Sequence, residues 1–187
     1  MDEAEAILRC QDGERDAFRF VVERHGRVLY GTAYMMTRDR QLAEDLVQEA
    51  LLLAWRNIPS FQQGTNFRAW LLRILVNRTK SELRKNRVRQ IELEEGAATL
   101  SDPGDVEDQV LQKEERKRIS QGLEALTPDY RQAVVLRYYA DLTGPEIAAT
   151  LGWPEGTVRS RLHRALAQLG QLLSEEEVRP FSICNSG

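Results

Sequence analysis

Two stretches of the chain carry most of the residues whose chemistry suggests a function, and in both that chemistry belongs to basic side chains. The first stretch runs from Asn66 to Arg89 and places eight arginines and lysines against a single acid, Glu82. Guanidinium and ammonium groups neutralise phosphates, so this stretch is suited to face a polyanion such as a nucleic acid. The alternative is an amphipathic bundle helix whose basic residues are only solvated.

Apolar residues in the same stretch predict that one side of it is buried. Trp70, Leu71, Ile74 and Leu75 recur at three- and four-residue spacing, which is typical of a helix that packs on a core. Aromatic rings at its start, next to a polar approach, are also suited to stack on an unpaired base. We therefore expect the loop of residues 62–67 and the polar face to meet nucleic acid.

The second stretch has the spacing of a helix-turn-helix. Thr143 and Glu146 form a predicted capping box at the start of a short helix. Ala148 provides a small residue where two helices cross, Gly152 suits a turn with positive φ, and Val158 is placed to wedge beneath a second helix. Generic helical hairpins sometimes mimic this spacing, so the charge pattern has to be weighed with it.

The outward face of that second helix is basic and polar, and no acid occurs between Thr157 and Gln171. Such a face suits the major groove of DNA, where arginine reads guanine with two hydrogen bonds and serine or histidine contacts other base edges. The candidate DNA-binding residues on this helix are Arg159, Ser160, Arg161, His163 and Arg164.

A further predicted helix, Gln41 to Asn57, has apolar residues on two stripes. A single packing partner would leave large side chains of one stripe exposed, so we expect a second partner, and acidic and amide residues border the stripes as in many protein interfaces. The alternative is a central bundle helix that is buried on all sides. The stripes consist of Leu42, Leu46, Ala50 and Leu53, and of Val47, Leu51, Ala54, Trp55 and Ile58.

Composition and periodicity predict the elements that must position these residues. Helical repeats without strand signals predict an all-α fold of two small helical domains joined by an acidic flexible linker, the second containing the helix-turn-helix. The net charge is only −3 because an acidic segment in the middle of the chain offsets the basic stretches on either side of it. The predicted segments are 1–90 for the first domain, 91–106 for the linker, 107–174 for the second domain and 175–187 for a disordered tail.

Several function classes are disfavoured by what the sequence contains. Cys10 and Cys184 form no metal-binding or disulfide pattern, and His25 and His163 are isolated. There is no glycine-rich phosphate loop and no nucleophile constellation, so we expect no enzyme activity, no metal and no cofactor. The absence of a long apolar run predicts a soluble, cytoplasmic protein without direct membrane contact.

Taken together, four segments closely resemble a bacterial sigma factor of the extracytoplasmic-function group. The combination is specific because GTVRSRLHRA and AEDLVQEA lie on either side of a basic FxxWL helix. The segments are DLVQEALLLAW, FRAWLLRILVN, LTPDYRQAVVLRYYADL and EIAATLGWPEGTVRSRLHRAL.

The resemblance implies a factor that binds core RNA polymerase and directs it to promoter DNA. The first domain would open and hold the promoter element nearest the start site, the −10 element, while the helix-turn-helix would read the upstream −35 element. An anti-sigma factor is also expected as a partner. The residues implied for the −10 element are Ser60, Phe61, Asn66, Phe67, Arg68, Arg73, Asn77, Lys80 and Arg84.

The same resemblance implies that the helix Gln41 to Asn57 docks on the clamp helices of the largest polymerase subunit. The residues implied for this interface are Asp45, Gln48, Glu49, Leu51 and Trp55. The competing hypothesis is a stand-alone helix-turn-helix regulator that binds duplex operators without polymerase. That hypothesis explains the second domain but leaves the docking helix and the basic aromatic helix without a role.

Overall fold

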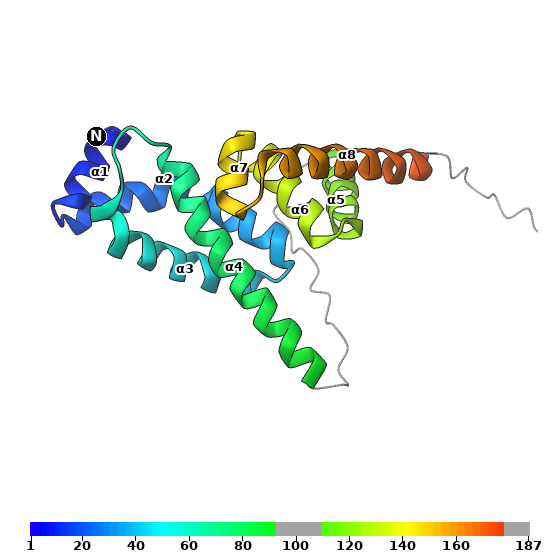
Figure 1. Cartoon of the computed structure of the whole chain (residues 1–187), viewed down its shortest axis with the longest axis horizontal. Coiled ribbons are helices and arrows are strands. Elements are labelled where there is room, and N and C mark those ends of the chain that lie inside the picture. Colours follow the sequence, from blue (N-terminus) through cyan, green and yellow to red (C-terminus); the bar gives the residue numbers. More distant parts are fainter. Residues whose placement is uncertain (93–109, 178–187) are drawn as a thin grey trace, which may run out of the picture.

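The computed structural model describes residues 1–92 and 110–177, and within these ranges the regular structure is entirely helical (Figure 1). Most of the predicted acidic linker, and the predicted tail from residue 178 on, lie outside the described residues. Along the described part of the chain, no helix combines the length and apolar character needed to cross a bilayer.

The first domain is a bundle of four helices. The helix α2 packs against α1, α3 and α4, and α3 also packs against α4. Its elements are α1 (Glu3–Gln11), α2 (Arg15–Thr37), α3 (Arg40–Asn57), the short 3₁₀ helix η1 (Ile58–Ser60) and α4 (Phe67–Glu92).

Local capping chemistry sets where α2 ends and α3 begins. The sequence predicts a tight turn at residues 37–39 with Asp39 as the N-cap of the next helix. This is confirmed, because the carboxylate of Asp39 accepts a hydrogen bond from the backbone N–H of Leu42 at 3.0 Å. Arg38, between the two helices, has φ of 60°. This left-handed conformation closes α2 and is uncommon for a residue other than glycine.

The two apolar stripes of α3 are covered from within the first domain. Leu46 on one stripe and Val47 and Ile58 on the other are buried in one cluster with residues of α2 and α4. The second packing partner that the two stripes predict is therefore supplied within the domain, because α3 lies between α2 and α4. In the preceding helix, the apolar spacing predicts that Val22 points inward together with Val21 and Leu29. This prediction was wrong for Val22, which is 38% exposed on α2.

The second domain contains the predicted helix-turn-helix. The capping box of Thr143 and Glu146 is confirmed, and Gly152 adopts a positive φ of 69°. Val158 is buried beneath the second helix, as predicted. The elements are α5 (Val110–Ala125), α6 (Pro128–Val134), the π-helical turn η2 (Val135–Tyr139), α7 (Gly144–Leu151) and α8 (Glu155–Glu177).

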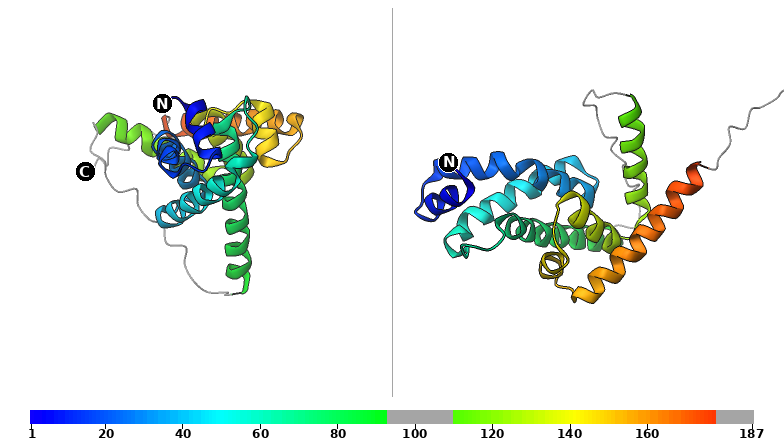
Figure 2. Two further views of the ribbon diagram at one scale, coloured as in Figure 1. Left: turned by 90° about the vertical axis from the view of Figure 1, so that its left-hand side faces the viewer. Right: turned by 90° about the horizontal axis from the view of Figure 1, so that it is seen from above.

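The two domains pack against each other, with α7 beside α4 and η2 beside α2 (Figures 1 and 2). Buried residues of α7, such as Ile147, belong to the same apolar cluster as the core of the first domain. At the closest approach, the ring of Tyr139 lies on Gly31, where any Cβ atom would overlap the tyrosine hydroxyl. That hydroxyl donates to the backbone carbonyl of Arg27 at 3.3 Å. We call these contacts between α2 or α4 and the second domain the domain interface.

Candidate nucleic-acid interfaces

The helix α8 presents polar and basic side chains to solvent. Arg159, Ser160, His163 and Arg164 are all exposed, while Val158 and Ala165 on the opposite side are buried. The hydroxyl of Ser160 donates to the carbonyl of Thr157 at 3.1 Å. Among the described residues, no hydrogen bond or ion pair engages the side chains of Arg159, His163 or Arg164. Three cationic or ionisable groups are therefore free to meet a ligand on this face.

Arg161 differs from its neighbours because its side chain is already engaged. Its guanidinium carbon lies 3.9 Å from the centre of the Trp153 ring, and Nη2 forms an ion pair with Asp129 at 3.0 Å. Stacking on an indole face and pairing with a carboxylate both fix a planar guanidinium. The structure therefore places Arg161 where it ties α8 to α6 and to the turn before α8.

The helix α4 carries the second set of candidate residues, and several of them are open to solvent. Ser60, just before the connecting loop, is exposed, as are Arg73, Asn77 and Arg84 along α4. The hydroxyl of Ser60 donates to the carbonyl of Asn57 at 2.7 Å. These four side chains lie on surface that a nucleic acid can reach.

Two other candidates on this surface are held by the second domain. The amide of Asn66 donates to Glu146 Oε1 at 2.6 Å, while its own side-chain oxygen caps α4 at the N–H of Ala69. The ammonium of Lys80 donates to the carbonyl of Leu151 at 3.1 Å. Both side chains are therefore part of the domain interface.

The hydrogen bond from Asn66 also affects the acidity of its partner. Partial burial raises the pKa of Glu146, but hydrogen bonds from the backbone and hydroxyl of Thr143 and from Asn66 outweigh it and lower the pKa. The carboxylate is thus held in its charged form at neutral pH. Glu146 closes the capping box and contacts the first domain with the same side chain.

Aromatic residues at the start of α4 are packed into the core. Phe61 and Phe67 are 5% and 3% exposed, and their ring centres lie 4.9 Å apart in an edge-to-face contact. Trp70 packs against both rings at 5.3 and 5.4 Å. In this arrangement the rings stabilise the loop before α4. Their predicted contact with DNA bases stays a prediction.

The candidate polymerase-facing residues of α3 share one side of that helix. Asp45, Gln48 and Glu49 are exposed, and the Nε atom of Arg78 on α4 donates to the Glu49 carboxylate at 2.8 Å. Leu51 and Trp55 are half-buried, with the Trp55 ring centre 5.3 Å from that of Phe18. The acidic residues therefore reach solvent, while the two apolar residues partly support the core.

The helix α3 also exposes an apolar residue that the sequence analysis missed. Leu52 is 59% exposed, more than any other large apolar residue of α3. It lies three residues after Glu49 and four after Gln48, so it shares their face. That spacing was present in the sequence, but Leu52 belonged to neither apolar stripe and was left out.

Comparisons with known proteins agree with this geometry. The family described as Sigma-70 region 2 matches residues 21–89, and the family described as Sigma-70, region 4 matches residues 116–169. The RNA polymerase sigma factor CarQ of Myxococcus xanthus is 34% identical over 91% of this chain and 97% of its own length. The ECF RNA polymerase sigma factor SigW of Bacillus subtilis is 33% identical over 90% of this chain and 95% of its own length. The chain belongs to the extracytoplasmic-function sigma factors.

Solved structures of other sigma factors have the same fold. Sigma factor RpoE from Bartonella quintana, solved with the anti-sigma factor NepR, superposes with a TM-score of 0.71 at 30% identity, covering 84% of this chain and 96% of that one. CnrH, solved with the cytosolic domain of CnrY, gives a TM-score of 0.68 at 27% identity, covering 92% and 97%.

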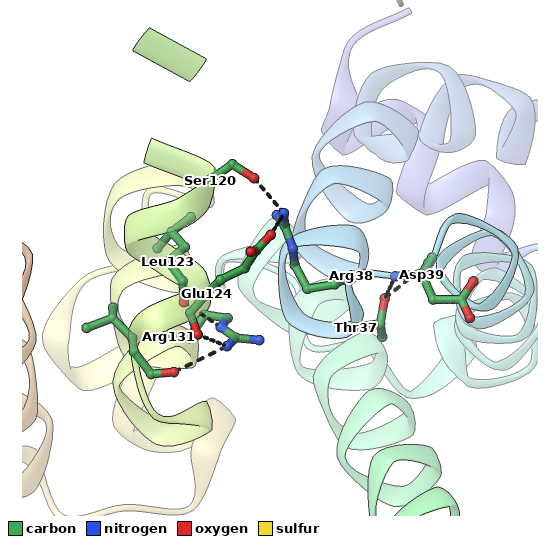
Figure 3. Close-up of polar contacts among 8 residues, drawn as sticks. Thr37, Arg38, Asp39, Ser120, Leu123, Glu124 and Arg131 are labelled. Carbon is green, nitrogen blue, oxygen red and sulfur yellow. Dashed lines mark hydrogen bonds and ion pairs between the residues drawn. The ribbon is translucent and has the colours of Figure 1, made fainter. Parts of the chain in front are cut away.

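A polar cluster at the end of α2 adds to the domain interface of this sigma factor. Figure 3 shows Arg38 reaching from the end of α2 to Ser120 and Glu124 on α5. Arg131 on α6 donates to the carbonyls of Leu123 and Glu124, which fixes the end of α5. The left-handed backbone of Arg38 thus coincides with a side chain that crosses between domains.

Proposed function

We propose that this sigma factor binds core RNA polymerase through the exposed face of α3 and directs the enzyme to promoters with α8 and α4. In this proposal α8 reads the −35 element in duplex DNA, and the loop before α4 with the polar face of α4 holds the separated −10 strand. The chain itself makes or breaks no covalent bond and needs no cofactor. Work on core polymerase would place it in the cytoplasm.

The observation that carries the proposal is the contrast between the two sides of α8. The inner side is fixed by Val158 and by the contacts of Arg161 with Trp153 and Asp129. The outer side is left with Arg159 and Arg164, which are free among the described residues. A rigid helix with unpaired arginines facing outward is what direct readout in a major groove requires.

The proposed polymerase interface combines charge with an apolar anchor. Asp45 and Glu49 provide carboxylates, Gln48 provides an amide, and Leu52 lies among them with more than half of its surface exposed. Interfaces draw most of their energy from a few central residues that become buried, with polar groups around them. We therefore propose Leu52 as the anchor on the clamp helices of the largest subunit.

The experiment that tests this function is reconstitution with core RNA polymerase. The wild-type chain is expected to bind core polymerase and to start transcription from a cognate promoter. Leu52→Asp should abolish core binding, because it places a charge where an apolar contact is buried. Leu8→Asp is the matched control, since Leu8 on α1 is also exposed, at 51%, and lies outside the proposed interface.

Two results would contradict the proposal. Specific binding of duplex DNA without any binding to core polymerase would identify a stand-alone regulator. Equal loss of polymerase binding in Leu52→Asp and Leu8→Asp would remove α3 as the docking face.

The relatives also suggest a protein partner. Two solved sigma factors of the same fold were captured with NepR and with the cytosolic domain of CnrY. We propose that an anti-sigma factor controls this chain as well, and that it engages both domains together.

A further inference from the structure

A hollow of about 650 Å³ opens where the two domains meet. Its walls come from α1, from α2, from the start of α4 and from η2 of the second domain. A volume of this size is in the range that holds a small molecule, about 300–1,000 Å³. The hollow lies apart from α8 and from the exposed face of α3.

The charge of the hollow is positive. Arg24, Arg27 and Arg68 line it together with one acid, Glu3. His25 is buried beside them with Nε2 2.8 Å from Glu3 Oε1, and burial lowers the pKa of His25 despite this carboxylate, so the ring is neutral at pH 7. Three guanidinium groups and one carboxylate leave a net charge of +2.

The arginines of the hollow differ in whether a carboxylate pairs with them. The guanidinium of Arg24 donates to Glu3 at 2.9 Å. Neither Arg27 nor Arg68 has an acidic partner among the described residues, and the Nε atom of Arg68 is buried without any hydrogen-bond partner. Since no carboxylate neutralises either guanidinium, an anion that enters the hollow meets two uncompensated positive charges.

The second domain completes one wall of the hollow. Tyr139 lines it while its ring rests on Gly31 and its hydroxyl donates to the carbonyl of Arg27. A ligand that fills the hollow therefore contacts both domains. By linkage, such a ligand favours the arrangement in which the domains are together.

We propose that this hollow is a binding site for a phosphate-bearing anion and that Arg27 and Arg68 are its main ligands. Guanidinium groups bind phosphate oxygens through paired, charge-assisted hydrogen bonds, which matches two arginines that lack carboxylate partners. The phosphate belongs to a small phosphorylated molecule, because a ligand of the hollow holds the two domains together, whereas a DNA strand that uses Asn66 has to break its contact with Glu146. Asn66 and Arg68, which line the hollow, are also residues implied for the −10 element, so a small anion is the probe that tests this site apart from the proposed function.

The test is calorimetric titration of the full chain at constant ionic strength with inorganic phosphate, with pyrophosphate and with a single-stranded oligonucleotide. We expect phosphate or pyrophosphate to bind, with affinity reduced about tenfold in Arg68→Gln and in Arg27→Gln, as expected for the loss of a charge-assisted hydrogen bond. Arg19→Gln is the matched control, because Arg19 on α2 is exposed and paired with Glu23. The control should bind as the wild type does.

The three probes also distinguish the source of the phosphate. Binding of phosphate and pyrophosphate that is lost in both variants assigns the site to a small anion. Binding of the oligonucleotide alone, lost in the same two variants, would assign these arginines to the −10 strand and would overturn the small-anion site. No binding by any probe, or equal losses in Arg27→Gln and Arg19→Gln, would overturn the site. The exposed position of Arg27 keeps this comparison informative even where Arg68→Gln unfolds the chain.

A third variant tests the part played by the second domain. Tyr139→Ala removes one wall of the hollow without changing its charge, so it should weaken binding of the same probe. Unchanged affinity in Tyr139→Ala would show that the first domain binds the anion alone and would overturn the linkage to domain packing.

Discussion

The two helices proposed to contact DNA differ in how much of their surface the rest of the molecule uses. On α8, Arg159 and Arg164 point to solvent with no partner among the described residues. Lys80 on α4, and Asn66 just before it, are hydrogen-bonded to the second domain, at the carbonyl of Leu151 and at Glu146. A DNA duplex can therefore reach α8 as it stands, whereas a strand that uses Asn66 and Lys80 must first break contacts of the domain interface.

This difference has a structural origin in the packing of the two helices. The helix α4 packs against α2, α3 and α7, so adjacent residues such as Leu71 and Leu72, and Leu75 and Val76, are buried together on a broad face. The helix α8 contacts its own domain along one side only, through residues such as Val158 and Ala165. Two helices with equally basic sequences can therefore differ in how easily DNA reaches their side chains.

The first prediction, with the largest change in stability, concerns whether α4 contributes more buried packing than α8. Leu75 is fully buried in α4, so Leu75→Ala should lower the free energy of unfolding by about 2–5 kcal/mol through lost packing and a cavity. Leu166→Ala makes the same chemical change on α8, where Leu166 is 43% exposed, and should cost about 1 kcal/mol or less. Chemical denaturation measures both. Similar losses would show that the helices are equally embedded.

A second effect concerns base recognition by α8. Arg164→Ala should cost about 1–3 kcal/mol of binding free energy at particular base pairs of the upstream element and little on other sequences. Arg161→Ala should instead weaken binding to all sequences, because Arg161 holds α8 against Trp153 and Asp129. Binding titrations with single base-pair changes in the duplex separate the two patterns. A uniform loss in Arg164→Ala would demote that residue to a phosphate contact.

A third prediction concerns how far the domain interface limits the binding of single-stranded DNA to α4. In Gly31→Ala the new methyl group overlaps the Tyr139 hydroxyl, which should weaken the domain interface by about 1 kcal/mol and raise single-stranded DNA binding about fivefold. Gly26→Ala is the matched control on the same helix, since its Cβ would meet no atom within 4 Å. Fluorescence anisotropy with a labelled single strand provides the measurement. Equal binding by both variants would mean that the interface does not limit access to α4.

The smallest effect is expected for the polar cluster of the domain interface. Arg38→Gln removes an ion pair with Glu124 that is partly exposed, so it should lower the free energy of unfolding by about 0.2–1 kcal/mol. The loss should shrink at high salt because exposed charges are screened. Denaturation curves at low and high salt check this, and a loss that does not depend on salt would assign the effect to the Arg38 backbone instead.

Local chemistry explains which parts of the fold were predictable from the sequence. Asp39 at the start of α3, the pair Thr143 and Glu146, and Gly152 were recognised correctly, because each acts within a few residues of its own position. The helix-turn-helix was predictable for the same reason. Its signals are a cap, a turn glycine and a buried β-branched residue at fixed spacing.

Long-range contacts explain what was missed. The coverage of both stripes of α3 depends on α2 and α4, and the contact of Tyr139 with Gly31 joins residues from different domains. The stacking of Arg161 on Trp153 could not be separated from base contact, because an outward position on a helix does not show which neighbour a long side chain meets. Periodicity gives the face of a residue but not its partner.

The π-helical turn η2 sets how α6 and α7 are rotated relative to each other within the second domain. Its hydrogen bond spans five residues, from the N–H of Ala140 to the carbonyl of Val135, so the turn holds one residue more than an α-helical turn would. Removing one residue would rotate the flanking segments by about 100°, taking Tyr139 off Gly31, while its neighbour Tyr138 remains 61% exposed. Substitution of the exposed Tyr138 should therefore have little effect on domain packing. A one-residue deletion in this turn would instead rotate α7 relative to α6, so that η2 and α7 could no longer contact α2 and α4 at the same time.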